Sequence, residues 1–294
     1  MNEQVLYDNP LEFYEYLLLG PLTMTYYPLS SEEIPVWQEY SNLLIDKFAI
    51  HSSSFFHLSK GIIERKKSGE VIKQRGYDLF TVNSTIRAII ETYSAFNHIF
   101  VEPKTSDEKK FRFLLWKLDG LFQKQKLEIY EDDFEGAKEI LDSYKLEISK
   151  TINEIETSNY KNTLSDSELL KIYNLSKKRI SWRFLVVENK VRPLKIIELV
   201  KHTCKQRAFV NVYKDSSIHL HSNYPSLEYF KGFRGKVITK EFTDPLVRLA
   251  IYLTSLMIHD ICFISNESKK KFELLPVEIK DFISGISKSI KEEH

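Results

Sequence analysis

The sequence predicts an all-α protein, a multi-helix bundle with at most one small hairpin, near residues 182–191. Its 294 residues include only nine glycines and nine prolines, about half the usual share of these helix-breaking residues. Hydrophobic residues make up 43% of the chain and charged residues 28%, which is typical of a folded globular protein. Apolar residues recur at intervals of three and four over long stretches, the spacing of one face of an α-helix.

The first half of the chain is expected to form five helices. Their ranges, in chain order, are residues 10–19, 31–66, 78–100 (or 83–100), 106–122 and 134–156. Most of them begin at a proline or at a residue whose side chain caps free backbone N–H groups, as Ser30 does together with Glu33. Gly20 and Pro21 should end the first helix, and the polar residues 67–76 should form a connector.

The second half is expected to add five more helices. Their ranges are residues 165–176, 193–200, 205–221, 244–264 and a last helix from residue 276. Ser165 and Glu168 match a second capping box, and Tyr224 with Pro225 should close the helix that precedes them. The lysines at 269–271 are expected in a solvated loop.

Residues 182–191 interrupt this helical pattern. Trp182, Phe184 and the valines that follow suit strands, and Glu188 with Asn189 suits a tight turn. The segment is therefore expected to be a hairpin or an irregular crossover.

Charge and cysteine content narrow the class of protein. Basic residues number 42 and acidic residues 41, a formal net charge of +1, which excludes a strongly basic protein that coats nucleic acid but not a local basic patch. The two cysteines, Cys204 and Cys262, are too far apart for a zinc-finger spacing or a disulfide framework. Without a repeat or a Gly/Ser linker, residues 1–294 are expected to form a single helical domain, with any subdivision near residues 160–180.

The most apolar stretch, residues 244–264, is long enough to span a membrane. It carries Arg248, His259 and Asp260, and each such group at membrane depth would cost a few kcal/mol. A buried core helix is therefore expected in place of a span. The N-terminus lacks the basic region of a signal peptide. The protein is expected to be cytoplasmic, without a membrane partner.

The helix expected up to residue 100 has two distinct sides. One side is apolar and comprises Ile86, Ile89, Tyr93, Phe96 and Phe100. The other is a polar stripe of Asn83, Arg87, Glu91, Ser94 and His98. The stripe is either a solvated face or an inward-facing polar cluster. If it faces inward, Arg87 and Glu91 need each other and further partners, because an unpaired buried charge costs several kcal/mol.

A second candidate group lies in the helix expected at 205–221. Tyr213, Ser217 and His221 follow one another at intervals of four and so share one face. His221 would sit near a helix C-terminus, where the helix dipole favours its protonated form. Alternatively, the three residues only satisfy local hydrogen bonds and cap the helix.

The R-x-x-x-E and Y-x-x-x-S-x-x-x-H patterns resemble those of the bacterial family called domain of unknown function 5677. The matching positions are Arg87, Glu91, Tyr213, Ser217 and His221, and the resemblance spans residues 79–221. It implies a helical fold and the same five residues as a site, without assigning a reaction.

Other signals are weaker. His219 and His221 would point apart on a helix, so no metal site is expected. His259 and Asp260 match only the dipeptide of HD phosphohydrolases. HEPN ribonucleases carry an arginine before their histidine, and the nearest match, at His219, has Lys214 in its place. Nucleotide-binding, hydrolase and metalloprotease motifs are absent from the sequence, and no cofactor is expected.

Two functions of different class follow. In the first, Arg87 binds a phosphate, Glu91 orients it and His221 is the general acid or base, as in a HEPN-like nucleic-acid-processing toxin or defence effector. The candidate binding residues are His98, Tyr213 and Ser217. In the second, the same cluster fixes helix register in a non-catalytic scaffold. The expected partner is accordingly RNA or another protein, and the sequence makes no prediction of oligomeric state.

Overall fold

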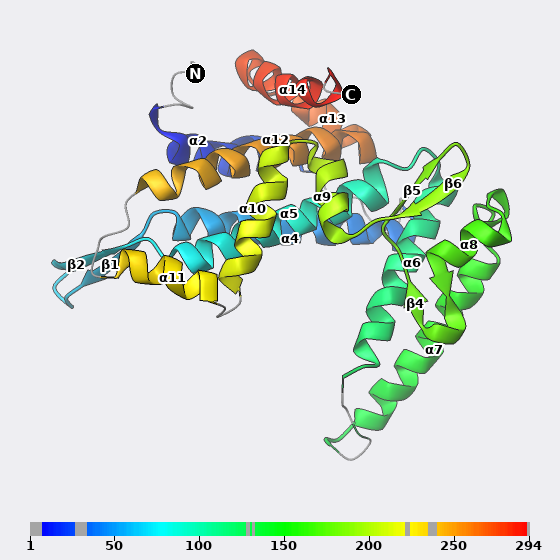
Figure 1. Ribbon diagram of the computed structural model, residues 1–294. Coiled ribbons are helices and arrows are strands. Elements are labelled where there is room, and N and C mark those ends of the chain that lie inside the picture. The colour runs from blue at the N-terminus through cyan, green and yellow to red at the C-terminus, as the bar shows by residue number, and fades with distance from the viewer. Residues whose placement is uncertain are drawn as a thin grey trace. The chain divides into compact units, whose positions relative to one another are not determined.

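The structure is a computed structural model that describes residues 8–26, 34–127, 130, 133–220, 224–234 and 240–292 (Figure 1). The chain divides into two compact units. Unit 1 comprises residues 1–97 and 200–294, and unit 2 comprises residues 98–199. The subdivision expected near residues 160–180 falls inside unit 2. That residues 1–294 form a single domain stays a prediction.

Unit 1 is helical apart from one hairpin. Its elements in chain order are α2 (Pro10–Leu17), η1 (Leu18–Leu22), α3 (Thr23–Thr25), α4 (Val36–Leu58), β1 (Ile62–Arg65), β2 (Val71–Gly76), α5 (Leu79–Phe96), α10 (Arg207–Leu220), α11 (Tyr224–Phe233), η5 (Lys240–Phe242), α12 (Asp244–Ile264), α13 (Asn266–Glu273) and α14 (Val277–Glu292). The chain passes between the units within η2 (Asn97–Val101) and at α9 (Ile196–Cys204). The predicted all-α fold class is confirmed, because the described strands form only two-stranded sheets.

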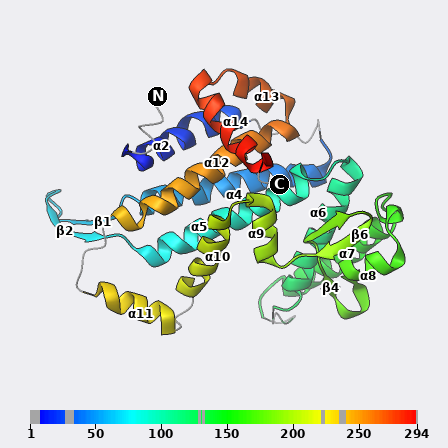
Figure 2. The same cartoon turned by 45° about the horizontal axis from the view of Figure 1, so that its top comes forward.

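The core of unit 1 forms around α5 and α12. Helices α4 and α10 pack against α5, while α12 lies between α5 and the pair α2 and α14 (Figures 1 and 2). Asp78 caps α5 by accepting hydrogen bonds from the backbone N–H groups of Phe80 and Thr81, both at 3.1 Å. Ile86 and Ile89 on the predicted apolar side are fully buried, each stabilising the fold by about 1.5–3 kcal/mol.

Helix α12 is the apolar stretch expected to be a core helix. Among the described residues it is the one helix long and apolar enough to cross a membrane, and 61% of its most apolar stretch is buried within the protein. This burial is consistent with the core helix of a soluble protein.

The helix expected over residues 31–66 and the connector over 67–76 are partly wrong. Helix α4 ends at Leu58, and an antiparallel β1–β2 hairpin follows. Gly61 and Gly69 have φ angles of 82° and 87°, a left-handed conformation that glycine adopts without a steric cost. Gly61 ends the helix region, and Gly69 turns the chain between the two strands.

The helix end expected at Gly20 and Pro21 is also wrong. The backbone continues through both residues as the π-helix η1 and then as α3. Proline lacks a backbone N–H and so leaves a carbonyl without its helical donor. The hydroxyl of Thr23 donates to the carbonyl of Leu18 at 2.9 Å, which satisfies a carbonyl in this widened turn.

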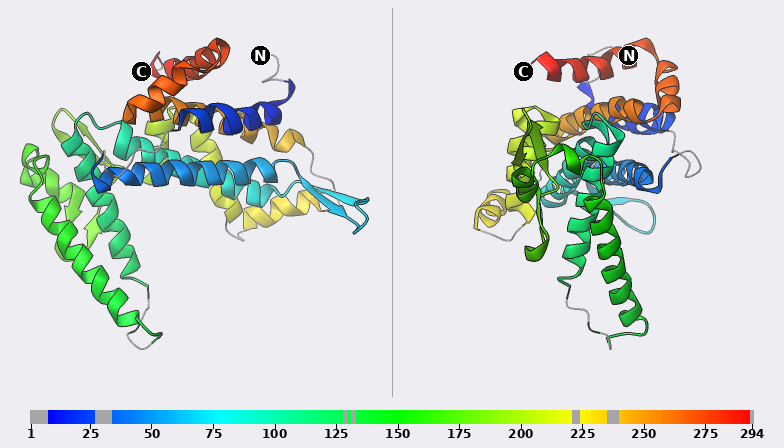
Figure 3. Two further views of the ribbon diagram at one scale, coloured as in Figure 1. Left: turned by 180° about the vertical axis from the view of Figure 1, so that it is seen from behind. Right: turned by 90° about the vertical axis from the view of Figure 1, so that its right-hand side faces the viewer.

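Unit 2 combines two long helices with short strands. Its remaining elements are α6 (Ser106–Lys124), α7 (Ala137–Glu156), η3 (Lys161–Thr163), α8 (Asp166–Ile172), β3 (Tyr173–Asn174), η4 (Leu175–Lys177), β4 (Arg179–Ile180), β5 (Phe184–Val187) and β6 (Lys190–Pro193). Helices α6 and α7 run side by side (Figure 3). Ser165 caps α8 as expected, by accepting a hydrogen bond from the backbone N–H of Glu168.

The hairpin predicted near residues 182–191 is confirmed. Strand β5 pairs antiparallel with β6, and Val187 faces Lys190 across a two-residue turn. Glu188 and Asn189 at this turn have φ angles of 50° and 60°. Two consecutive left-handed residues match the twist of the flanking strands.

Three further predictions of element boundaries are wrong. Pro193 ends β6, where it was expected to begin a helix. Tyr224 and Pro225 begin α11 rather than closing the helix before them, because proline suits the first turn of a helix as well as the region beyond its end. The lysines at 269–271 lie in α13, which is capped by Ser265.

Candidate functional site

The polar stripe of α5 faces other helices of unit 1. Asn83 and Ser94 are buried. Asn83 accepts a hydrogen bond from Ser216 of α10 at 3.4 Å, and Ser94 accepts one from Thr203 of α9 at 2.9 Å. The inward-facing alternative therefore holds for Asn83 and Ser94. Ser216 and Thr203 were not singled out from the sequence, because each is one of many serines and threonines on helices.

Arg87 is the centre of this interface. Its Nε donates to Oε1 of Glu91 at 2.9 Å, one turn further along α5. Its two terminal nitrogens donate across to α10, to the hydroxyl of Ser217 at 2.8 Å and to that of Tyr213 at 2.9 Å. The guanidinium also lies 4.5 Å from the centre of the Tyr213 ring, within cation–π range. We call Arg87, Glu91, Tyr213 and Ser217 the Arg87 cluster.

Tyr213 closes the network by donating its hydroxyl proton to Oε1 of Glu91 at 2.8 Å. Burial, together with the carboxylate of Glu91, raises the pKa of Tyr213 to about 12. Burial alone would lower the pKa of Arg87, but the hydrogen bonds and charges of Glu91 and Tyr213 outweigh it, so the pKa of Arg87 is raised. Both groups thus keep their protons at neutral pH, and neither can act as a general base there.

The Arg87 cluster is partly open to water. The side chain of Arg87 is 22% exposed and that of Glu91 is 41% exposed, whereas Tyr213 is buried. A small ligand or a backbone phosphate approaching from solvent would therefore meet Glu91 and Arg87 before Tyr213.

The structure brings together four of the six candidate residues. His221 lies outside the described residues, directly after Leu220, where α10 ends. Its predicted role stays a prediction. The nearby His219 is described, with its Nε2 3.5 Å from Oδ2 of Asp215.

His98, the sixth candidate, belongs to a different network in unit 2. Its Nδ1 lies 2.8 Å from Oε2 of Glu102 and 2.9 Å from Nη1 of Arg112, and Arg112 also donates to Glu108 at 2.7 Å. Burial, and then the charge of Arg112, lowers the pKa of His98 to about 4. This neutral, fully buried imidazole has the setting of a structural histidine. Its position on the stripe did not predict that it belongs to a network separate from the Arg87 cluster.

His259 and Asp260 lie within unit 1. Asp260 accepts hydrogen bonds from the hydroxyl of Tyr93 at 2.9 Å and from the amide of Asn97 at 2.7 Å. His259 Nδ1 lies 3.3 Å from both Asp260 and the hydroxyl of Ser287. Over the part of the chain that the structure describes, no group of three His, Cys, Asp or Glu side chains could hold a metal ion. Asp260 is thus held by two hydrogen-bond donors.

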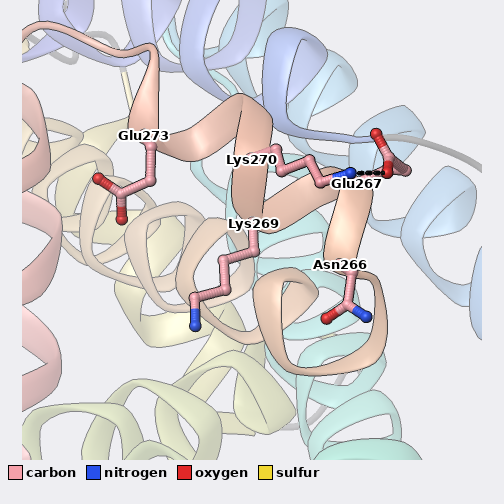
Figure 4. A pocket seen from close by; sticks show the side chains of 5 residues that line it. All are labelled: Asn266, Glu267, Lys269, Lys270 and Glu273. Atoms are coloured by element: carbon pink, nitrogen blue, oxygen red, sulfur yellow. Dashed lines mark hydrogen bonds and ion pairs between the residues drawn. The ribbon is translucent and has the colours of Figure 1, made fainter.

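A surface hollow of about 440 Å³ lies on α13. It is lined by Asn266, Glu267, Lys269, Lys270 and Glu273, and Figure 4 shows Lys270 turned toward Glu267. Both side chains of this ion pair are largely exposed. An exposed pair of opposite charges adds little binding energy, so the Arg87 cluster is the stronger candidate site.

No protein-family model matches this chain, and neither a curated protein nor a solved structure matches it. The resemblance to the family of unknown function 5677 therefore stays a prediction that rests on five residues.

Proposed function

We propose that the protein is a bacterial, cytoplasmic effector that cleaves RNA at the Arg87 cluster, in the manner of a HEPN-like toxin or defence protein. The proposal is supported by one observation above others. An arginine is held in a fixed orientation by three side chains and is still open to water. A preorganised guanidinium of this kind suits the recognition of a phosphate group.

Arg87 has hydrogen-bonding capacity to spare. A guanidinium carries five N–H donors. The contacts with described residues use one donor on each of its three nitrogens. One N–H on each terminal nitrogen is left for the oxygens of a phosphodiester.

Glu91 adds a hydrogen-bond acceptor to the site. Its carboxylate offsets the charge of Arg87, so simple electrostatic attraction for phosphate is weak. The Glu91 side chain is 41% exposed, so its carboxylate can accept a hydrogen bond from a substrate hydroxyl, and the ribose 2′-hydroxyl is the donor that distinguishes RNA from DNA. RNA is therefore the favoured substrate class.

The proton transfer would fall to His221. Arg87 and Tyr213 hold their protons at neutral pH because of their raised pKa values, and histidine titrates near neutrality. Tyr213 and Ser217 act as positioning residues that orient Arg87.

The proposal is tested by RNA cleavage and growth arrest. Wild type should cleave single-stranded RNA and arrest growth, while His221→Ala and Arg87→Lys should lose about 10²–10⁴-fold in rate. Arg179→Lys, an exposed arginine in β4, is the matched control and should retain activity. Equal rates for wild type and His221→Ala would remove this histidine from the mechanism.

A non-catalytic scaffold is the second candidate. It is favoured by the mutual satisfaction of the four residues, since Tyr213 and Ser217 both connect α10 to Arg87 of α5. If the protein is a scaffold, the Arg87→Lys and Tyr213→Phe variants should lose stability and have no cleavage activity to lose.

A further inference from the structure

Arg87 and Glu91 give the Arg87 cluster a net charge close to zero. Over its full described length, α5 carries no other charged residue, and the ion pair joins Nε of Arg87 to Oε1 of Glu91 at 2.9 Å. Tyr213 keeps its proton at neutral pH because its pKa is raised to about 12. The positive charge of Arg87 is therefore offset by the single negative charge of Glu91.

The charged groups next to the cluster leave this balance unchanged. On α10, Lys214 and Asp215 directly follow Tyr213, and both are exposed and of opposite charge. Besides burial, the groups that shift the pKa of Arg87 are those of Glu91 and Tyr213. Among the described residues, the electrostatics of the site are thus set by Arg87 and Glu91.

The cluster presents an acceptor beside its donors. Both hydrogen bonds that Glu91 makes within the cluster end on Oε1, one from Arg87 and one from Tyr213. Oε2 is therefore left for a donor from outside the cluster, and the Glu91 side chain is 41% exposed. A phosphate that meets the spare N–H groups of Arg87 thus lies close to a carboxylate that water can reach.

A site without net charge treats singly and doubly charged phosphates differently. The cost of taking an ion out of water rises with the square of its charge, and a neutral site offsets little of that cost by attraction. A phosphate at the end of a strand carries close to two negative charges at pH 7.5, because its second pKa is about 6. A phosphodiester inside a strand carries one.

We propose that Glu91 makes the Arg87 cluster selective for the singly charged phosphodiester inside a strand, against the doubly charged phosphate at a strand end. The inference rests on the proposed function for the kind of polymer, whereas the selection depends only on the charges of the cluster. Arg87 donates hydrogen bonds to the phosphate oxygens. Glu91 cancels the field that would attract a second negative charge, and is thus a specificity-determining residue. Cleavage is accordingly expected within a strand and not at its phosphorylated end.

The test compares two small ligands that differ by one charge, adenosine 5′-phosphate and its methyl ester at the phosphate. At pH 7.5 the first is close to doubly charged and the second is singly charged, and an ordinary histidine is mostly neutral. Neither ligand is an RNA strand, so binding is measured without cleavage. Affinities for the full chain are read by ³¹P NMR titration, below the melting temperature of each variant.

Wild type should bind the methyl ester more tightly than adenosine 5′-phosphate. Glu91→Gln keeps an oxygen for Arg87 and Tyr213 but removes the negative charge, so it should strengthen the binding of both ligands. At about 5 Å in water, one added positive charge raises the affinity about fourfold for a singly charged ligand and about 16-fold for a doubly charged one. The preference for the methyl ester should therefore fall about fourfold. Glu278→Gln, at an exposed carboxylate of α14, is the matched control and should bind both ligands as wild type does.

Three results would overturn the proposal: no binding of either ligand by wild type, a wild-type preference for adenosine 5′-phosphate, or an equal change for the two ligands in Glu91→Gln. An RNA cleavage assay on wild type separates this proposal from the proposed function. A preference for the methyl ester without RNA cleavage supports the selection and contradicts the proposed function. Cleavage of RNA without a preference between the two ligands does the reverse.

Discussion

Arg87 makes contacts that a lysine in its place would not reproduce. A guanidinium donates in three directions within one plane, to Glu91, Ser217 and Tyr213, whereas an ammonium is a compact point charge. The sequence identified these four residues through their four-residue spacing on two helices. It could not show that the helices meet, because spacing reports which residues share a face but not what that face contacts.

Tyr213→Phe should destabilise the fold by about 1 kcal/mol, because it removes a hydroxyl that accepts from Arg87 and donates to Glu91. Combined with Glu91→Gln it should show a coupling energy of about 0.5 kcal/mol, at the low end because Glu91 is partly exposed. Chemical denaturation of the two single variants and the double variant measures the coupling. Tyr213→Phe with Glu278→Gln, an exposed residue of α14, should be additive. If the stability changes of Tyr213→Phe and Glu91→Gln were also additive, this would contradict the hydrogen-bond network.

His98 should make unit 2 sensitive to acid. Burial lowers its pKa to about 4 from an ordinary 6.5, so below pH 6.5 the unfolded chain binds more protons than the folded one. The stability that neutral His98 contributes is full above about pH 6.5. It is lost as the pH falls toward 4, by an amount on the order of 3 kcal/mol.

Urea unfolding between pH 7 and pH 4.5, followed by tryptophan fluorescence, tests this effect. Two of the three tryptophans, Trp116 and Trp182, lie in unit 2. His98→Asn should flatten the dependence on pH, and His57→Asn, at an exposed site, should leave it unchanged. An equally steep dependence in His98→Asn would show that other groups cause the acid sensitivity.

At the scale of elements, local signals predicted a boundary well only where one or two side chains decide it. The start of α12 at Asp244 and Pro245 and the turn at Glu188 and Asn189 were predictable, because each depends on one or two side chains. The β1–β2 hairpin and α11 were not. A proline such as Pro225 permits either a helix start or a helix end, and tertiary contacts decide between them.

Replacement of two glycines of unit 2 by alanine should change the stability of the fold in opposite directions. Neither has an atom within 4 Å of an added Cβ, but Gly136 has a φ of 87° at the start of α7. Gly136→Ala should therefore cost about 1–2 kcal/mol through backbone strain. Gly120→Ala, inside α6, should stabilise by about 0.5–1 kcal/mol because it lowers the entropy of the unfolded chain. Thermal unfolding measures both. The same sign for the two would contradict the assigned backbone conformations.

For the whole molecule, the net charge of +1 concealed how the charges are distributed. Composition excluded a protein that is basic throughout, and that exclusion stands. It could not reveal that α5 and α11, which are far apart in the chain, meet at one end of unit 1; the ring contact between Phe80 and Phe230 reveals it. Contacts between elements so far apart in the chain depend on packing, and no local pattern in a single sequence predicts them.

The central claim is that the Arg87 cluster acts on a substrate and does more than hold α5 to α10. Single-turnover cleavage of single-stranded RNA by wild type, Arg87→Lys and Arg179→Lys, with the melting temperature of each, tests it most directly. Arg87→Lys should lose about 10²-fold or more in rate at a temperature where it is still folded, while Arg179→Lys should match wild type. No cleavage by wild type, or a loss in Arg87→Lys that merely follows its melting temperature, would contradict the claim.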